Sequence, residues 1–156
     1  MSGQTDRIEQ QVLLPNPQSR VWRALSDAAQ FAEWFGIKFD GPFAAGKSTN
    51  GKIAIKGQEV TFEFAIEAIE PERRFAFRWH PYAIDPNVDY SSEPMTHVEF
   101  TLAAVDGGTM LKVVESGFDK IPASRRVEAF QMNTNGWTGQ MKRIAKYLAE
   151  APVTQS

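Results

Sequence analysis

Residues 60–79, VTFEFAIEAIEPERRFAFRW, contain two alternating runs and the turn between them. In each run an apolar side chain occupies every second position, which is typical of a strand with one buried face. Residues 70–72, Glu-Pro-Glu, separate the runs and are expected to turn the chain. The stretch therefore predicts two antiparallel strands that share one aromatic face. The side chains predicted to lie on that face are Val60, Phe62, Phe64, Ile66, Ala68, Phe75, Phe77 and Trp79.

Further strands are predicted on both sides of this hairpin. Two later runs alternate in the same way around the turn Asp106-Gly107-Gly108, and the first apolar run of the chain ends at Pro15. Together these segments predict an antiparallel meander. The predicted strands are residues 8–14, 37–39, 52–56, 60–69, 74–80, 96–104 and 110–116.

Two short helices are predicted between the first strand and the rest of the sheet. Asn16 is a favourable N-cap, and Pro17 at the first helical position loses no hydrogen bond there. The pair Ser26-Asp27 can cap a second helix, which Gly36 is expected to end.

The last element has a helical period. Residues 123–149 contain no proline, and large apolar side chains recur at spacings of three and four. Such a helix spans roughly 40 Å, longer than one strand, so we expect it to cross the sheet diagonally. The chain is therefore predicted to be an α+β domain of the helix-grip type, in which a curved antiparallel sheet wraps around the C-terminal helix. The repeating positions are Phe130, Thr134, Trp137, Met141, Ile144 and Leu148.

Composition narrows the classes of function. The chain has 156 residues, 42% of them hydrophobic, no cysteine and a formal charge of -2. This composition favours one globular domain over residues 7–150 between loose ends at 1–6 and 151–156. The small negative charge provides no positive electrostatic potential that would attract nucleic acid. The polar N-terminus and the lack of any long apolar run predict no signal peptide and no membrane span, and hence a cytoplasmic protein.

Several short motifs, taken together in their order along the chain, resemble those of a known family. The chain resembles the activator-of-heat-shock-protein-ATPase-homologue family, within the START-like (SRPBCC) superfamily of helix-grip proteins. The motifs are Pro17, Val21-Trp22-x-Ala24-Leu25, Trp34, Glu70-Pro71-x-Arg73-x-Phe75-x-Phe77-x-Trp79, Val98-Glu99-Phe100-x-Leu102, Glu115-Ser116-Gly117-Phe118 and Asn133-x-x-Gly136-Trp137.

The resemblance implies a deep, mostly apolar cavity between the sheet and the last helix. The superfamily uses that cavity for lipid carriage, hormone sensing and polyketide cyclisation. It also implies a chaperone as a secondary partner. The eukaryotic co-chaperone is similar only over its C-terminal domain, and its separate chaperone-binding domain does not fit within 156 residues.

Aromatic side chains from three strands and two helices are the candidate ligand-binding residues. They can interlock as a solid core, or they can line a pocket that the curved sheet leaves open. We expect Asn133, Thr134 and Gly136 to be the positions where the pocket wall is polar or has little side-chain bulk. The candidate lining residues are Trp34, Phe62, Phe64, Phe77, Trp79, Phe100, Glu115, Phe118, Trp137 and Met141.

Three residues are candidate acids or bases. Glu115 shares the parity of Leu111 and Val113, so its carboxylate either lies on the cavity wall or, if the strand frays, points to solvent or to an arginine of the last helix. Tyr82 and Tyr90 lie in the long loop after residue 80, which can act as a lid.

Other chemistries have no support in the sequence. His80 and His97 have the outward parity of their strands and no metal-ligand spacing, so no metal site is predicted. No phosphate-binding glycine motif and no serine nucleophile motif occur, and no cofactor is predicted. The leading hypothesis is a protein that binds a small hydrophobic, aromatic or polyketide-like molecule. A cyclase or hydrolase that uses the same cavity, and a module that stimulates a chaperone ATPase, are the alternatives.

Overall fold

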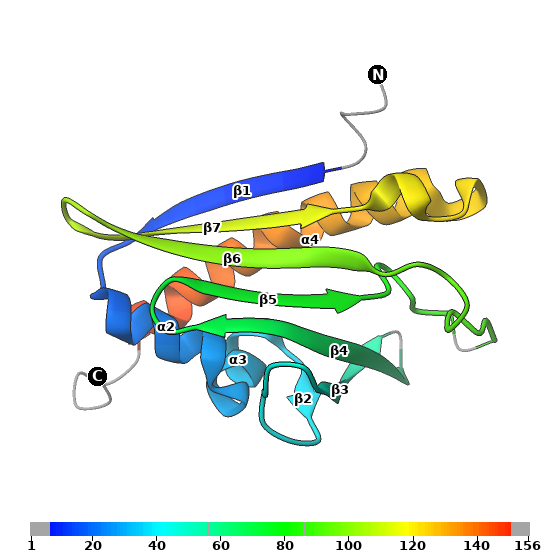
Figure 1. The fold of residues 1–156 in the computed structure, drawn as a ribbon, viewed down its shortest axis with the longest axis horizontal. Coiled ribbons are helices and arrows are strands. Elements are labelled where there is room, and N and C mark those ends of the chain that lie inside the picture. Colours follow the sequence, from blue (N-terminus) through cyan, green and yellow to red (C-terminus); the bar gives the residue numbers. More distant parts are fainter. Residues whose placement is uncertain (1–6, 56, 86, 151–156) are drawn as a thin grey trace.

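Among the described residues, seven strands form one antiparallel sheet in the order β1-β7-β6-β5-β4-β3-β2 (Figure 1). The computed structural model describes residues 7–55, 57–85 and 87–150, so the predicted loose ends at 1–6 and 151–156 lie outside the described residues. The strands are β1 (Arg7–Leu14), β2 (Lys38–Phe39), β3 (Ser48–Ile55), β4 (Gln58–Glu70), β5 (Arg74–Trp79), β6 (Thr96–Val105) and β7 (Gly108–Ser116).

Three α-helices complete the part of the domain that the structure describes. They are α2 (Gln18–Ser26), α3 (Ala28–Phe35) and α4 (Ala123–Glu150), and the short 3-10 turn η1 (Phe118–Lys120) precedes α4. The long helix α4 crosses behind the curved sheet at an angle (Figure 1). The predicted α+β helix-grip architecture is therefore confirmed.

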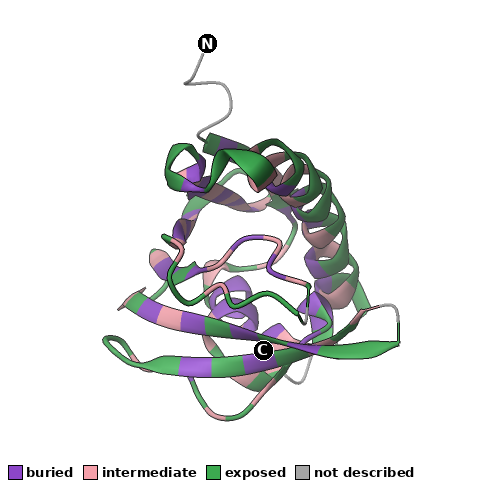
Figure 2. Ribbon diagram, turned by 90° about the vertical axis from the view of Figure 1, so that its right-hand side faces the viewer, coloured by how far each residue is buried: buried purple, intermediate pink, exposed green. Residues whose placement is uncertain are grey.

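Buried and more exposed positions alternate along most of β4, β6 and β7, as the period of two predicts (Figure 2). A β-bulge after Ile66 breaks this pattern in β4. Beyond the bulge Ile69, not Ala68, lies opposite the buried Phe75. The prediction that Ala68 shares the inner face was therefore wrong, because one extra residue in a strand reverses the parity of all positions after it.

The two short helices begin differently from each other. Asp27 caps α3 as predicted, since its side chain accepts a hydrogen bond from the Ala29 N–H, and Gly36 ends α3 in the left-handed conformation. The cap predicted for α2 was wrong. Pro17 itself is the N-cap residue, and no side chain caps the helix, because the backbone turns into the helix one residue later than the Asn-Pro pattern indicates.

The centre of the core is a set of interlocked aromatic rings. Phe31 of α3 is fully buried, and its ring lies 4.7 Å from Trp34, 4.9 Å from Phe35 and 5.6 Å from Phe43, centroid to centroid. Edge-to-face and stacked ring pairs of this kind pack at the density of a protein interior. At this end of the domain the aromatic residues therefore form a solid core.

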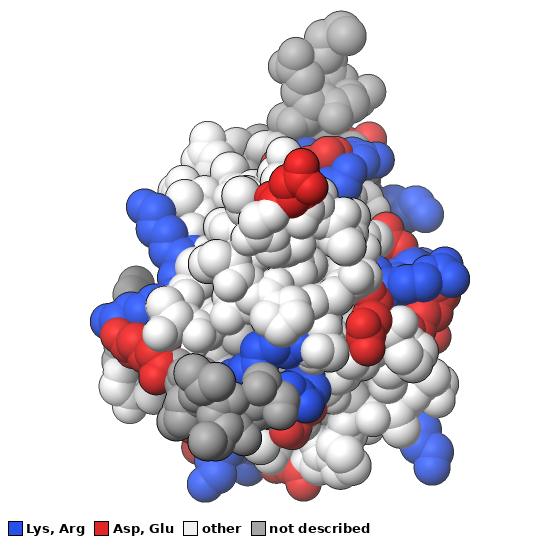
Figure 3. Space-filling view, turned by 90° about the vertical axis from the view of Figure 1, so that its left-hand side faces the viewer, with Lys and Arg blue, Asp and Glu red and all other residues white. Residues whose placement is uncertain are grey.

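Charges on the surface are mixed. On the end of the molecule seen in Figure 3, basic and acidic side chains alternate around an uncharged centre. No helix in the described part of the chain is both long and apolar enough to span a membrane.

Candidate functional site: a buried carboxylate beside an aromatic pocket

Strand pairing turns Glu115 into the interior. Glu115 lies on β7 directly opposite Val98 of β6 and Ile8 of β1, and both of these neighbours are buried. The Glu115 side chain is itself 0% exposed. Of the two predicted orientations the inward one is therefore present. The arginines of α4 have other partners, because Arg125 pairs with Glu93 and the Nε of Arg126 donates to the Ile121 carbonyl.

Four side chains donate hydrogen bonds to the Glu115 carboxylate. The indole N–H groups of Trp79 and Trp137 each lie 2.8 Å from one of its oxygens. The hydroxyl of Thr96 donates at 2.5 Å, and the Nδ2 of Asn133 lies 3.0 and 3.2 Å from the two oxygens. These donors come from β5, β6 and α4. The carboxylate therefore joins the sheet to the long helix.

This environment changes the acidity of the carboxyl group. Burial raises the pKa of Glu115 above its usual range, and the four hydrogen bonds lower it only in part. Glu115 forms no ion pair among the described residues. A buried carboxyl without a cationic partner is costly, and such groups concentrate at functional sites.

The raised pKa predicts that stability depends on pH through Glu115. The pKa in the folded state lies above the reference value of 4.5, so the folded state binds the proton more tightly and stability falls as the pH rises from 4.5 through the folded pKa. Glu115→Gln removes this titration. As the pH rises, the free energy of unfolding of the wild type should therefore fall relative to that of the variant, by at most about 1.4 kcal/mol per pH unit.

Urea unfolding of both proteins between about pH 4 and about pH 8 measures this difference. Glu63→Gln, at an exposed position of β4, is the matched control, and its difference from the wild type should not follow the same trend. A wild-type advantage over Glu115→Gln that stays constant or grows with pH would contradict the raised pKa.

A pocket of about 120 Å³ lies beside the Glu115 cluster. Three aromatic rings meet at this pocket. The ring centroid of Phe35 lies 6.1 Å from that of Trp79 and 5.9 Å from that of Trp137, and the ring centroids of the two tryptophans lie 6.0 Å apart. The remaining lining residues all come from one face of α4. They are Asn133, Gly136 and Gln140.

The structure divides the candidate lining residues into two groups. All ten are buried, with exposed fractions of 8% or less. Only Trp79 and Trp137 line the pocket beside Glu115. Phe62 and Trp34 border other surface hollows, of about 270 and 280 Å³. The residues that pack within the core or contact the two tryptophans are Phe64, Phe77, Phe100, Phe118 and Met141.

Of the three positions expected to line a pocket on α4, two do so and one does not. Asn133 and Gly136 line the pocket as predicted. Thr134 lies elsewhere, because its hydroxyl donates to the Phe130 carbonyl and its own carbonyl accepts a hydrogen bond from Gln10 of β1.

Sequence reasoning missed Thr96, Phe35 and Gln140. Thr96 has the same parity in β6 as Val98, which was a usable signal for an inward side chain. Gln140 follows Trp137 by three residues, a spacing that places both on one helix face.

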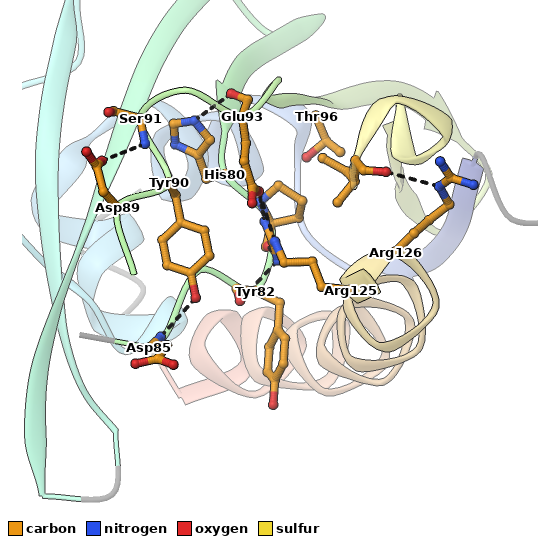
Figure 4. Close-up of polar contacts among 12 residues, drawn as sticks. His80, Tyr82, Asp85, Asp89, Tyr90, Ser91, Glu93, Thr96, Arg125 and Arg126 are labelled. Atoms are coloured by element: carbon orange, nitrogen blue, oxygen red, sulfur yellow. Dashed lines mark hydrogen bonds and ion pairs between the residues drawn. The ribbon is translucent and has the colours of Figure 1, made fainter. Parts of the chain in front are cut away.

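Arg125 holds the loop after β5 against the start of α4 (Figure 4). Its guanidinium pairs with Glu93 at 2.7 Å, donates to the Pro81 carbonyl at 2.8 Å and lies 4.8 Å from the centre of the Tyr90 ring. The Tyr90 hydroxyl accepts a hydrogen bond from the Asp85 N–H. Tyr90 borders the hollow between the loop and β4. Neither Tyr82 nor Tyr90 is among the described residues that line the pocket beside Trp137.

A larger hollow, of about 440 Å³, lies at the surface between α3 and the segment after β2. Its polar lining side chains are Asp27, Lys38 and Asp40, and it does not reach the Glu115 cluster. We therefore take the smaller pocket as the candidate site. No group of His, Asp or Glu that could hold a metal ion occurs among the described residues.

Solved structures of similar fold cover nearly the whole chain. DynU16, from the dynemicin biosynthetic locus, is 26% identical with a TM-score of 0.73; the match covers 93% of this chain but only 48% of DynU16. The chain thus spans about half the length of DynU16. MLL2253 from Mesorhizobium loti is 22% identical with a TM-score of 0.73, and the match covers 94% of this chain and 99% of that one. A protein from Arthrobacter aurescens is 15% identical with a TM-score of 0.77, covering 95% and 88%.

No curated protein sequence matches the chain. A family model does match, over residues 15–149, and it is described as "Activator of Hsp90 ATPase homolog 1-like protein". That range runs from the end of β1 to the last turn of α4, and includes every residue of the Glu115 cluster. The fold of this family is known for ligand binding. The chain belongs to the family of activator of Hsp90 ATPase homolog 1-like proteins.

Proposed function

We propose that this protein binds a small hydrophobic molecule in the pocket formed by Phe35, Trp79 and Trp137. The observation that carries the proposal is an aromatic pocket placed directly against a buried carboxylate cluster. Apolar walls with a few convergent polar groups are typical of small-molecule sites. The ligand-binding use of the fold in this family supports the same interpretation.

The size of the pocket limits the ligand. Its volume of about 120 Å³ is below the roughly 300 to 1,000 Å³ of sites for drug-sized molecules. It is close to the roughly 150 Å³ of an apolar cavity that accepts benzene. The pocket therefore matches a single aromatic ring, and a polyketide-like molecule needs a displacement of α3 or of Gln140.

The glycine in the pocket wall supports the proposal, because it leaves space that a ligand can occupy. Gly136 and Gly139 both lie inside α4, where glycine costs about 1 kcal/mol relative to alanine. A Cβ at either position meets nothing within 4 Å. Packing against the protein therefore does not require either glycine, but only Gly136 lines the pocket.

The two glycines provide a matched test. Gly136→Leu places a branched side chain at the pocket, whereas Gly139→Leu places the same side chain outside the pocket lining. We expect the dissociation constant for toluene to rise at least about tenfold in Gly136→Leu, because overfilling a small cavity costs about 1–3 kcal/mol. It should stay unchanged in Gly139→Leu. Calorimetric titration measures both.

The two variants should be equally well folded, since each replaces an exposed helical glycine by a strong helix former. Equal toluene affinities in the wild type and both variants, or no binding by the wild type, would contradict the proposed site.

The two other functions remain predictions. A cyclase or hydrolase needs an accessible acid or base, and both oxygens of Glu115 already accept hydrogen bonds. Stimulation of a chaperone ATPase rests on the description of the family model alone. Assays of ATP turnover with added protein test that function directly.

A further inference from the structure

Strand β2 forms one edge of the sheet, beside helix α3 (Figure 1). It pairs with β3 on one side, where Lys38 lies opposite Lys52 and Phe39 opposite Gly51. No described strand lies on its other side. A free strand edge can pair with a further extended segment, provided that nothing else covers it.

The backbone hydrogen bonds around β2 show which way its polar groups point. Asp40 donates its N–H to the Asn50 carbonyl of β3, whereas Ile37 donates its N–H to the Ala32 carbonyl of α3. In an antiparallel pair, the backbone groups of successive residues point alternately toward the partner strand and away from it. The N–H and C=O of Phe39 are therefore directed away from β3. Neither group has a backbone partner outside the strand ladder among the described residues.

A groove lies along this free edge. It is the hollow of about 440 Å³ between α3 and residues 38–42, and Phe39 is one of its lining residues. On the α3 side it is lined by Ala28, Ala29 and Ala32, whose small side chains leave space beside β2. The volume lies within the roughly 300 to 1,000 Å³ that is usual for binding sites. We call this hollow the edge groove.

The charges at the edge groove favour a basic occupant. Asp27 and Asp40 both line it, and Lys38 is the only cation among its described lining residues. Asp40 forms no ion pair within the described part of the chain. Opposite charges on directly opposite strand residues attract each other, and like charges repel. A cationic side chain opposite Asp40 therefore complements the edge.

We infer that the edge groove binds an extended peptide segment of another protein, as an added antiparallel strand with a Lys or Arg opposite Asp40. In an antiparallel pair one peptide residue exchanges both backbone hydrogen bonds with Phe39, which is slightly more stable than parallel pairing. The backbone bonds supply affinity, and the charged pair fixes the register. This function is separate from the proposed ligand binding, since the edge groove and the pocket beside Trp137 share no lining residue.

Three peptides test the inference by NMR titration of the isotope-labelled protein. The probe is acetyl-Thr-Lys-Val-Thr-Val-amide, whose Lys is expected opposite Asp40 and whose first Val is expected opposite Phe39. One control peptide replaces Lys by Glu. The other methylates the backbone nitrogen of the first Val, which removes the N–H that the Phe39 carbonyl would accept.

We expect the probe to shift the Phe39 amide proton downfield, because that N–H gains an acceptor. The affinity should be about threefold to tenfold lower for the Glu peptide, which meets Asp40 with a like charge. It should be about tenfold lower for the methylated peptide, which loses one backbone hydrogen bond and adds bulk at the edge.

Asp40→Asn tests the charged pair. The preference for the Lys peptide over the Glu peptide should fall at least about twofold in this variant. Asp106→Asn is the matched control, at an exposed turn position outside the described lining of the edge groove, and it should keep the preference of the wild type.

Ala29→Leu tests the location by filling the edge groove. It should weaken binding of the probe at least about fivefold, because overfilling a binding space is unfavourable. Ala149→Leu is the matched control, since Ala149 is an exposed alanine of α4 that is not among the described lining residues. Its affinity for the probe should equal that of the wild type.

Three results would overturn the inference. They are an unshifted Phe39 amide at millimolar probe, equal affinities of the probe and its methylated form, and equal affinities of Ala29→Leu and Ala149→Leu. A dimer of the protein that Ala29→Leu disperses would assign the edge to a second copy of this chain, and would also overturn it. Gly136→Leu should bind the probe as the wild type does, so failure of the toluene site leaves the edge groove standing.

Discussion

Glu115→Leu is expected to lower the free energy of unfolding by about 3–5 kcal/mol. The leucine removes the common acceptor of Trp79, Thr96, Asn133 and Trp137, which surround a side chain with no exposure to solvent. Each buried donor left without a partner costs about 1–3 kcal/mol, which the gain from removing one desolvated charge only partly offsets. Urea unfolding followed by tryptophan fluorescence measures the loss.

Glu67→Leu is the control for Glu115→Leu. Glu67 lies on the outer face of the sheet, where it pairs with Arg78 and His97 at the surface. Exposed ion pairs of this kind contribute about 0–1 kcal/mol, so the control should be nearly neutral. Equal stability of Glu115→Leu and the wild type would show that the carboxylate does not hold the sheet and α4 together.

Phe31→Ala is expected to cost about 3–5 kcal/mol and to lower Tm by about 10 °C. Phe31 is fully buried, and its ring contacts other aromatic rings on α3, on β4 and in the segments between them. Truncation leaves a cavity that these neighbours can fill only in part. Thermal unfolding followed by circular dichroism measures the shift.

Leu13→Ala is the control for Phe31→Ala. Leu13 is 50% exposed on β1, so its truncation should change stability by only about 0.5 kcal/mol. A Tm of Phe31→Ala close to that of Leu13→Ala would mean that the aromatic rings around Phe31 are loosely packed, contrary to the structure.

Most of the fold could be predicted from local patterns. The period of two between Val60 and Ile66 depends only on neighbouring residues, and the structure buries those positions as expected. The cap of α3 at Asp27 and its end at Gly36 are equally local, since both depend on backbone geometry within one turn.

The predictions from sequence were wrong where a contact with a distant part of the chain overrides a local pattern. The bulge after Ile66 is set by pairing with β5, and the sequence of β4 continues its alternation without a visible break. The start of α2 has a similar cause. The Asn16 carbonyl accepts a hydrogen bond from the Thr109 hydroxyl on β7, a contact that joins residues 93 positions apart.

The sequence by itself determined the order of strands and helices and the apolar face of α4, because each follows from a repeat of two or of about 3.6 residues, but it left open whether Glu115 points inward or to solvent. Only the tertiary structure decided what Glu115 meets and how much space remains beside it. Its donors come from β5, β6 and α4, and the register that aligns them is set across the whole sheet. A pocket of about 120 Å³ is the small difference between two large packed volumes, and no single segment of the chain encodes such a difference.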